Sequence, residues 1–589
     1  MNIVGFDFGT TNSLISKVTG GRVINYTDDI TGLPYPSVVC YRGGQVIVGS
    51  QAKQLVSQAG LGIQDNIIVS PKFELGKESI FVEGVQRSPV DIVSDVVSFV
   101  VSEAVNSSRG GGQQIDKAVV TIPVDFEGYR RAALREAFQK AGVGVVQFVH
   151  EPLAALYGFF RGQKDFEETL REFNKKLVLV FDWGGGTLDL TLCKIIDGNL
   201  YQLKNDGTDQ VGGDMFDYAI QNAVVERVSK DRELDDVDVS QNSKKRFRAV
   251  CERAKIDLSS KDKVNLYEED FFQNIDGDPD LDYQLTRTEL EDIVTPILEK
   301  GIRRIRSLLE MADVEPSEIY ACIATGGMAN MPAIKARLHE IFGPQRVRVS
   351  EKSATMIAEG AAWMAYDEAQ LHLGKRVELL LARNNRVPLI NADIPMPKES
   401  EVFEDKFSTF CVDPRDGYAK FQIESPLRPG KKILNNDLRV TLANMVLKVD
   451  ENADPFKERL SINLKLDDNL ILFLEASSDK SGEASETEIH ELEFSLKFPD
   501  INASSNGGEE DSIIEIPDSE AGSPGELTMR SNLSQSDKDY SMIPGELARK
   551  VRPQLLNRMN PSYSEMQAEE DIYYQHLKPA SGLRVYKYR

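Results

Sequence analysis

Two short segments, far apart in the chain, share a pattern of residues with the chemistry to bind a polyphosphate. One reads FDFGTTN at residues 6–12, and the other reads FDWGGGT at residues 181–187. Each runs from an apolar stretch into an Asp, an aromatic residue and a glycine-containing turn with Thr. Glycine allows close backbone approach to phosphate oxygens, and carboxylates can hold a hydrated Mg²⁺. The pair predicts two turns that clamp one polyphosphate beside a metal ion.

Asp7 and Asp182 stand at equivalent strand ends of this repeat. Across a pseudo-twofold axis, their carboxylates would converge on one metal ion, and a water on that ion can act as the attacking nucleophile. For one hairpin alone, an Asp that only stabilises its own turn is the favoured interpretation. The occurrence of the Asp in both copies favours the metal.

A third glycine element, Gly326 and Gly327, lies between a strand pattern and a helix pattern in the segment 322–338. A helix that begins there would point its N-terminus back at the sheet, which suits a contact to a base or ribose. Glycine pairs between strand and helix are also common in purely structural turns. Taken alone, the pair leaves both interpretations open.

The elements that must position these turns are those of an α/β fold in two related halves. Each hairpin is followed by alternating strand and helix patterns, such as a strand over 117–123 and a helix over 127–141. Near residue 373, short strands separated by turn residues take over, which is typical of an all-β sandwich. These later strands are expected at residues 377–381, 386–389, 419–423, 460–466, 470–475 and 488–497.

These patterns divide the chain into four parts. From residue 500 to 530 the chain holds eight acidic residues against one basic residue, with Ser, Gly and Pro throughout, which predicts disorder. The predicted parts are a nucleotide-binding domain at 1–372, a linker at 373–385, a β domain at 386–499, and an acidic, disordered linker and tail at 500–589.

Composition excludes several classes of function. The net charge of −24 over 589 residues disfavours sequence-independent binding to nucleic acid. The five cysteines are widely spaced without metal-ligand spacing, which indicates reduced core residues of a cytosolic protein. Neither a secretory leader nor an apolar run of about 18 residues is visible. We therefore expect a cytoplasmic protein without nucleic-acid or membrane partners.

Seven blocks within residues 1–370 resemble, in order, those of the heat shock protein 70 (DnaK-type) chaperone family. They are FDFGTTNS, VTIPVDF, HEPLAALYG, FDWGGGTLDL, DGTDQVGGDMFD, CERAKIDLSS and TGGMANMP. The resemblance implies an actin-like ATPase fold with two lobes and a duplicated βαβ core, followed by a sandwich-like β domain. It also implies an ATPase that slowly hydrolyses ATP to control the binding of unfolded polypeptide.

The resemblance further implies roles for individual residues. The residues implied in catalysis are Lys72, Glu151, Asp182 and Thr187, and those implied around Mg²⁺ and K⁺ are Asp7, Asp182 and Asp189. Without the resemblance, Lys72 would be interpreted as an ordinary solvated lysine. Glu151 would then be a carboxylate that favours the positive end of a helix.

The residues implied in binding ATP or ADP come from five blocks. They are Gly9, Thr10, Thr11, Asn12, Gly184, Gly185, Gly186, Thr187, Gly212, Gly213, Asp214, Glu252, Lys255, Ser259, Gly326, Gly327 and Asn330. By periodicity alone, the three that lie between 252 and 259 are polar positions on an amphipathic helix.

The sequence also departs from the family pattern. Asn330 stands where an arginine usually stacks on adenine, so that planar stacking contribution is lost. Gln147 stands where an arginine commonly joins the surface for the interdomain linker and the J-domain co-chaperone. The run VELLL at 377–381 is either that linker or a first β-domain strand, and the family's helical lid has no counterpart.

Rival functions therefore stay open. A nucleotide-binding scaffold or regulator with weak or no hydrolysis is the main alternative, and an actin-like filament protein or a sugar-type kinase shares the same fold. The expected partners are unfolded client polypeptides, together with a J-domain co-chaperone and a nucleotide exchange factor.

Overall fold

The computed structural model describes residues 2–499, except 57–65, 108, 110–111, 235–238, 274, 276, 351, 382–383, 430–432 and 435, and also the backbone of 538–539. The predicted tail at 500–589 otherwise lies outside the described residues. Two compact units form, which we call the nucleotide unit (1–374 and 493–498) and the β unit (375–492, with the described residues 499 and 538–539).

Two mixed sheets with the same strand order form the centre of the nucleotide unit. The first runs β11-β10-β1-β2-β3 and the second begins β18-β17-β12-β13-β14, each with an antiparallel hairpin flanked by two parallel strands. The strands of the first are β1 (Ile3–Phe8), β2 (Asn12–Thr19), β3 (Arg22–Tyr26), β10 (Lys117–Ile122) and β11 (Gly144–His150). Those of the second are β12 (Leu177–Trp183), β13 (Leu188–Ile196), β14 (Asn199–Thr208), β17 (Ile319–Thr325) and β18 (Val347–Val349). This duplication is the one that the internal sequence repeat predicts.

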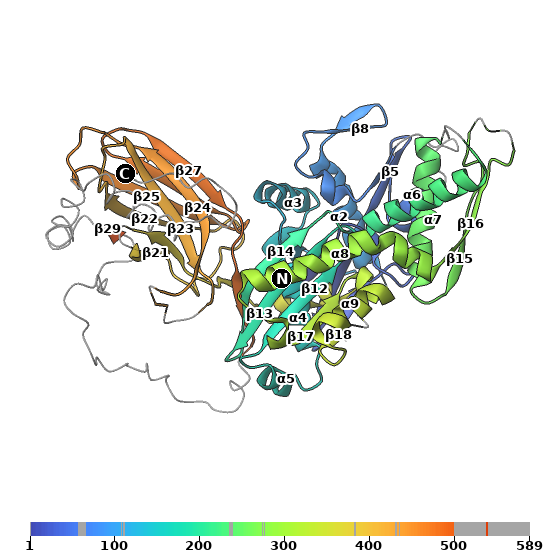
Figure 1. The fold of residues 1–589 in the computed structure, drawn as a ribbon, viewed down its shortest axis with the longest axis horizontal. Helices are drawn as coiled ribbons and strands as arrows, with labels where there is room; N and C mark the ends of the chain where they lie inside the picture. Colours follow the sequence, from blue (N-terminus) through green and yellow to red (C-terminus); the bar gives the residue numbers. More distant parts are fainter. Residues whose placement is uncertain are drawn as a thin grey trace. The chain divides into compact units, whose positions relative to one another are not determined.

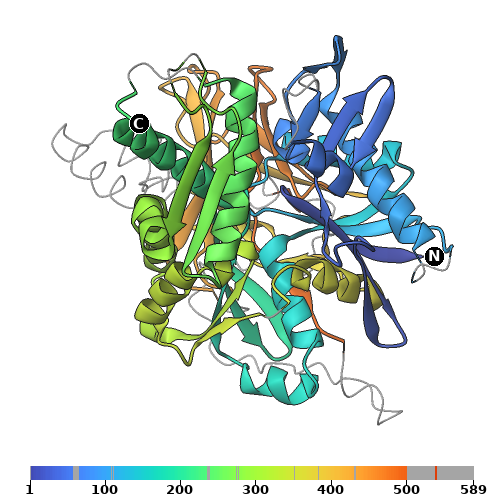
Figure 2. The same ribbon diagram turned by 90° about the vertical axis from the view of Figure 1, so that its right-hand side faces the viewer.

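Helices surround these sheets, and Figure 2 shows the blue N-terminal elements on the right of the unit and the green ones on the left. They are α1 (Ser50–Val56), α2 (Pro89–Asn106), α3 (Gly128–Lys140), α4 (Glu151–Arg161), α5 (Phe166–Glu172), α6 (Gly213–Asp231), α7 (Gln241–Leu258), α8 (Arg287–Met311), α9 (Pro332–Phe342) and α10 (Met356–Tyr366). The central strand β12 is buried along almost its whole length because helices cover both faces of the sheet. Helix α8 begins at a capping box between Thr286 and Glu289, which satisfies its first N–H groups.

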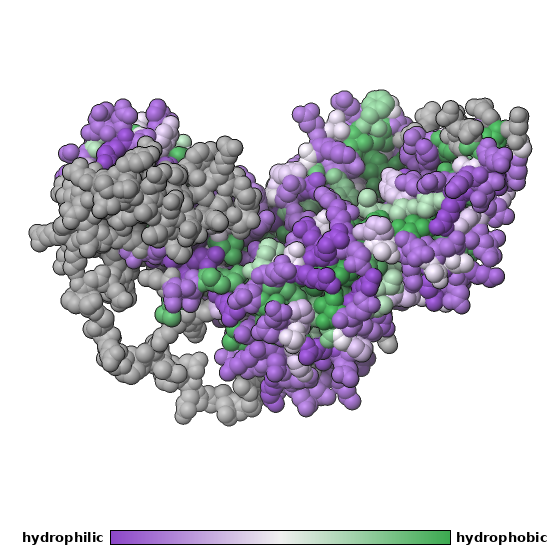
Figure 3. All heavy atoms as spheres, in the orientation of Figure 1, coloured by the Kyte–Doolittle hydropathy of each residue, from purple (hydrophilic) through white to green (hydrophobic). Residues whose placement is uncertain are grey.

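Small sheets and short helices complete the nucleotide unit. They are β4 (Tyr35–Pro36), β5 (Val38–Arg42), β6 (Gln45–Val48), β7 (Ile67–Val69), β8 (Ile80–Val82), β9 (Val85–Arg87), β15 (Lys263–Glu268), β16 (Leu281–Thr286) and the 3₁₀ helices η1 (Pro71–Glu74), η2 (Pro316–Glu318) and η3 (Gly327–Asn330). Figure 3 shows hydrophobic surface at the hairpin β8–β9, where Phe81 is 72% exposed. All five cysteines are buried as free thiols. Among the described residues, no helix is long and apolar enough to cross a membrane.

Two sheets make up the β unit, with strand orders β21-β20-β23-β24 and β27-β26-β25-β22-β29 (Figure 1). The strands are β20 (Val377–Leu380), β21 (Arg386–Ile390), β22 (Val402–Phe410), β23 (Tyr418–Pro426), β24 (Arg439–Lys448), β25 (Arg459–Asp467), β26 (Leu472–Ser478), β27 (Ala484–Ile489) and β29 (Lys538–Asp539). The run VELLL supplies β20, a fully buried strand paired with β21 and β23. Of its two interpretations, the structure shows the strand.

The chain returns to the nucleotide unit after β27. Strand β28 (Phe494–Lys497) pairs with β14 on one side and with β19 (Leu371–Leu373) on the other, so the second sheet gains two strands. The predicted strand at 488–497 is therefore two strands in different units. The predicted linker at 373–385 and β domain at 386–499 likewise differ from the observed units, because pairing between β19 and β28 places both in the nucleotide unit.

A chain that ends at residue 385 lacks β28 and leaves the edge of β14 uncovered. We expect its nucleotide unit to melt at least about 5 °C lower than in the full chain, because losing one buried Phe costs roughly 3–5 kcal/mol. Scanning calorimetry checks this. The matched control joins Gly374 to Glu493 by a short glycine loop, which keeps β28 and should restore the melting temperature. Equal melting of both shortened chains would contradict the expectation.

Candidate functional site

The two glycine turns of the sequence repeat face each other. A methyl group placed on Gly185 would lie 2.1 Å from Thr11 Oγ1, and one placed on Gly186 would lie 2.6 Å from Thr10 Cγ2. Side chains at these positions would push the turns apart, so glycine is required for their approach. The structure thus brings together the residues that the sequence predicts as a clamp.

Hydrogen bonds from Ser37 hold the first turn, whereas the Thr11 hydroxyl group of that turn has no hydrogen-bond partner among the described residues. Ser37 donates from its Oγ to the Gly9 carbonyl (2.9 Å) and from its N–H to the Thr11 carbonyl (2.8 Å). Within the described part of the chain, Thr11 Oγ1 is buried without a hydrogen-bond partner. Buried polar atoms are rarely unpaired in native proteins, so this hydroxyl suits a ligand oxygen.

Lys72 and Glu151 form a buried ion pair. Lys72 Nζ lies 2.9 Å from Glu151 Oε1, and the two residues are 2% and 7% exposed. Lys72 follows Pro71 in η1, and Glu151 is the first residue of α4. The interpretation of Lys72 as a solvated lysine is therefore wrong, because a partner 79 residues later in the chain compensates its buried charge.

Three more carboxylates lie near this pair. Asp7 accepts a hydrogen bond from Thr121 Oγ1 (2.6 Å), and Asp189 accepts one from the Val124 N–H (2.8 Å). Burial, followed by the charge of Glu151, raises the pKa of Asp7 to about 7. The same two causes, in the same order, raise the pKa values of Asp182 and Asp189 well above the usual range. The carboxyl groups of these three residues and of Glu151 thus outnumber the single nearby ammonium group among the described residues, that of Lys72.

This donor set fits a divalent cation that keeps its water shell. Across the described ranges, no three Asp, Glu, His or Cys side chains stand close enough to hold an ion directly. Asp189 Oδ2 is nevertheless buried without a hydrogen-bond partner among these residues, and its neighbours are carboxylates. Mg²⁺ usually binds through one or two carboxylates and several waters. The predicted residues Asp7, Asp182 and Asp189 fit such an ion through bridging water.

Two hollows adjoin the facing turns. The first, of 250 Å³, is lined among others by Thr10, Lys72, Asp125, Thr187 and Asp209. The second, of 400 Å³, is lined among others by Thr11, Lys53, Asp214, Arg248 and Glu252. Because Thr10 lines one and Thr11 the other, a ligand held by the first turn can extend into both.

The start of helix α6 packs on the second turn. The N–H of Gly213 donates to the Gly184 carbonyl (3.1 Å), and that of Asp214 donates to the Gly185 carbonyl (2.8 Å). Lys255 Nζ donates to the Gly213 carbonyl (2.9 Å) and pairs with Asp217 (2.8 Å). A methyl group on Gly212 would lie 2.4 Å from the Gly186 carbonyl carbon. These predicted residues therefore lie at the turn.

The remaining predicted residues fall into two groups. Gly326 has a φ of +80°, and a methyl group there would lie 2.6 Å from Asp182 Oδ1, so it belongs to the site. Ser259 instead caps the C-terminal end of α7 and donates to the Lys255 carbonyl (3.4 Å). Asn330 donates to Ser353 Oγ (3.1 Å), and Gly327 borders open space.

Some lining residues escaped the sequence analysis. Lys53 pairs with the predicted Glu252 at 2.8 Å, but nothing in the pattern around Lys53 indicates it. Asp125 lies in VTIPVDF, one of the seven blocks that resemble the family, and this resemblance could have identified it as a site residue. Burial, then the charge of Asp209, raises the pKa of Asp125 to about 6.

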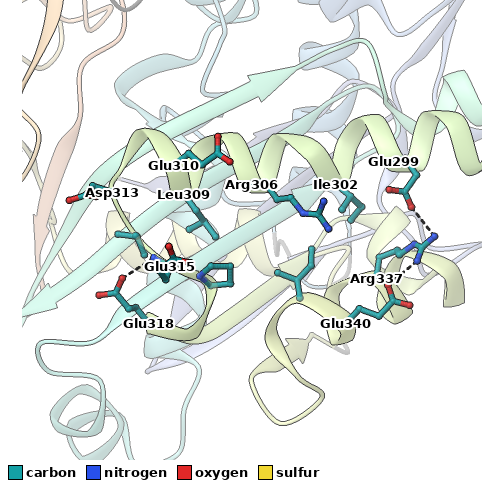
Figure 4. A pocket seen from close by; sticks show the side chains of 13 residues that line it. Glu299, Ile302, Arg306, Leu309, Glu310, Asp313, Glu315, Glu318, Arg337 and Glu340 are labelled. Carbon is teal, nitrogen blue, oxygen red and sulfur yellow. Dashed lines mark hydrogen bonds and ion pairs between the residues drawn. The ribbon is translucent and has the colours of Figure 1, made fainter.

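A groove of 720 Å³ lies away from these turns, between α8, η2 and α9 (Figure 4). Six acidic side chains and two arginines line it, and Arg337 pairs with Glu299 and Glu340 at 2.8 Å each. None of its lining residues is a glycine, so the groove lacks the close backbone approach to phosphate that the two facing turns offer. The nucleotide is therefore assigned to the facing turns.

Comparison with known proteins agrees with this geometry. The family model described as "Hsp70 protein" matches residues 3–381. The chain belongs to the Hsp70 family. The chain is 30% identical over 425 residues to the chaperone protein DnaK of Thermosipho melanesiensis, which covers 68% of this chain and 67% of that protein.

Two further DnaK proteins are similar. The one from Mycoplasmoides gallisepticum is 29% identical over 367 residues, which is 61% of this chain and 59% of that protein. The one from Cenarchaeum symbiosum is 31% identical over 354 residues, which is 58% of this chain and 51% of that protein. The match thus spans between half and two thirds of these relatives' length. The match to the Hsp70 family model ends at residue 381, before most of the β unit.

Repulsion among the carboxylates predicts a pH-dependent gain in stability for Asp182→Asn. A carboxyl with a raised pKa in the folded state stabilises the fold below its unfolded value of 3.8, and this contribution is lost as pH rises through the folded-state pKa, which for Asp182 lies well above 3.8. Without Mg²⁺ and nucleotide, we expect Asp182→Asn to melt roughly 2 °C or more above the parent at pH 8, with a smaller difference at pH 5.

Thermal melts at the two pH values measure this difference. Asp282→Asn, at an exposed position of β16, is the matched control and should leave the melting temperature unchanged. A lower melting temperature of Asp182→Asn at pH 8 would show that the carboxylates do not repel one another.

Proposed function

We propose that the chain is an ATP-dependent chaperone that binds ATP with Mg²⁺ between its two sheets and hydrolyses it slowly to control the binding of unfolded polypeptide by the β unit. The observation that carries this proposal is the pair of facing glycine turns with the Lys72–Glu151 ion pair beside them. Family membership supports the same conclusion.

The turns would bind and align the polyphosphate. Their backbone N–H groups and the hydroxyls of Thr10, Thr11 and Thr187 are suitable donors, and the Thr11 hydroxyl is without another partner among the described residues. Alignment matters because proteins catalyse phosphoryl transfer chiefly by positioning and by charge stabilisation. The unpaired hydroxyl supports the assignment of this turn to phosphate.

Lys72 would stabilise the negative charge that develops on the transferring phosphoryl group. It lines the 250 Å³ hollow together with Thr10 and Thr187, and Glu151 fixes its ammonium at 2.9 Å. That hollow leaves room for an attacking water. A bound Mg²⁺ supplies further neutralisation of the phosphates, and K⁺ is proposed as a second ion near the same carboxylates.

The two sheets of the β unit support client binding in a general way, because the family's β domain binds peptide. Unfolded polypeptides are the proposed clients, and a J-domain co-chaperone and a nucleotide exchange factor are the proposed partners.

A second function is a nucleotide-binding scaffold with weak or no hydrolysis. It is favoured by the residues that are predicted to contact the adenosine part of the nucleotide. Asn330 stands in place of the stacking arginine, and its side chain is bonded to Ser353. Glu252, a predicted nucleotide contact, is paired with Lys53. Both side chains are thus already engaged, which favours weaker nucleotide binding.

Single-turnover hydrolysis of ATP separates the two functions. We expect Lys72→Ala to lower the rate by about 10²-fold or more, because loss of one preorganised charge typically costs that much. The control Lys77→Ala removes a more exposed lysine that is paired with Glu74, and should hydrolyse ATP at the parent rate. Added unfolded peptide should stimulate the parent. ATP binding without turnover or peptide response would favour the scaffold.

A further inference from the structure

The return strand β28 is built into the core of the nucleotide unit. Phe494 and Leu496 are fully buried, and Phe498, just after the strand, is 6% exposed. The N–H of Gly374 donates to the Glu493 carbonyl (2.7 Å), so the chain leaves for the β unit and returns from it at adjacent positions. The β unit is therefore an insertion between two neighbouring strands of the ATPase sheet.

Both ends of the return strand contact the segment that carries Glu151. The ring of Phe494 lies 5.2 Å from that of His150, the residue before Glu151. The ring of Phe498 stacks on Tyr157 of α4 at 4.7 Å, with an interplanar angle of 16°. Because Glu151 is the first residue of α4, the strand packs against this helix and the residue before it.

Gln202 of β14 connects the strand to His150 through hydrogen bonds. Its Oε1 accepts from the Phe494 N–H (2.9 Å), and its Nε2 lies 3.3 Å from His150 Nδ1. Gln202 is fully buried, so its amide has no water with which to replace either partner. Movement of the strand would therefore displace His150 as well.

Both connections to the β unit are short. Residues 374–376 join β19 to β20, and residues 490–493 join β27 to β28. Fully extended, these connections span roughly 14 Å and 17 Å between the flanking strands. A displacement of the β unit beyond that reach must pull on β19 and β28 themselves. The β unit thus has a direct covalent connection to the strand that contacts the Glu151 segment.

We propose that β28 and Phe498 position Glu151, and through it Lys72, and that the β unit acts on ATP hydrolysis by moving this return strand. Gln202 and Phe494 are positioning residues that transmit the displacement to His150. This inference rests on the proposed ATPase function. It assigns regulation to the second connection of the insertion, at residues 490–493.

Gln202→Leu tests the positioning role, because it removes both hydrogen bonds at similar volume. We expect ATP affinity within about 3-fold of the parent, since the turns are untouched, and at least a 10-fold lower single-turnover rate. Amide exchange should rise in residues 151–156 of α4, beyond the direct partners of Gln202, which a purely local packing defect at β14 and His150 would leave unchanged. Gln221→Leu is the control, because Gln221 is also buried but bonds to Lys244 in the α6–α7 region.

Lengthening the second connection tests regulation without altering any buried residue. Glu491 is exposed, and about ten Gly and Ser residues inserted after it would let the β unit move without displacing β28. We expect basal hydrolysis within 2-fold of the parent and loss of stimulation by unfolded peptide. The same insertion after Gly482, in the turn between β26 and β27, should preserve stimulation.

The outcomes separate this inference from the proposed function. A parent chain without turnover overturns the proposed function, and the inference falls with it. A parent that hydrolyses ATP, with Gln202→Leu equal to Gln221→Leu and stimulation preserved after the insertion at Glu491, overturns the inference alone.

Discussion

The close contact of two glycine turns is the constraint on which the nucleotide unit depends. Gly185 and Gly186 lie so near Thr11 and Thr10 that neither position has space for a side chain. The turns meet only if both hairpins end at the same level, which the pairing of Asp182 with Asp189 across β12 and β13 secures in the second sheet. Helix α6 then starts against the same turn through its first N–H groups. A few backbone contacts thus align sheets, turns and helix around one small volume.

Charge is the second constraint, and it opposes folding in the absence of a ligand. Burial, followed by the charge of Glu151, raises the pKa values of Asp7, Asp182 and Asp189, while Lys72 lowers those of Asp7 and Asp182. Such a cluster is costly in a protein without its ligand, because like charges are held together away from water. A ligand that brings a cation stabilises the folded state by mass action. The charges that suit the site for a metal–nucleotide complex are thus those that leave it strained without one.

Local patterns predicted the parts of this structure that depend on nearby residues. The repeated hairpins form as expected, and the strand β10 and the helix α3 lie within one residue of their expected limits. Local patterns could not predict the burial of Lys72, because its ion-pair partner Glu151 is 79 residues away in the sequence. Local patterns also could not predict that the expected strand at 488–497 is divided between β27 and β28. Alternation of apolar residues gives a strand's buried face and does not say which sheet it joins, and Phe494 bonds to a residue 292 positions earlier.

The insertion of the β unit also changes how the nucleotide unit is completed. A chain made from its N-terminus presents β14 long before β28 exists, so an edge of the second sheet stays open until residue 497 is available. Tyr157 and Phe160 lack the Phe498 ring during the same interval. Open edges and exposed aromatic side chains favour aggregation. The short connections counter this exposure, because the hydrogen bond between the Gly374 N–H and the Glu493 carbonyl shows that the two ends of the inserted unit lie close together. Folding of the inserted unit therefore lowers the entropy cost of closing the sheet that contains it.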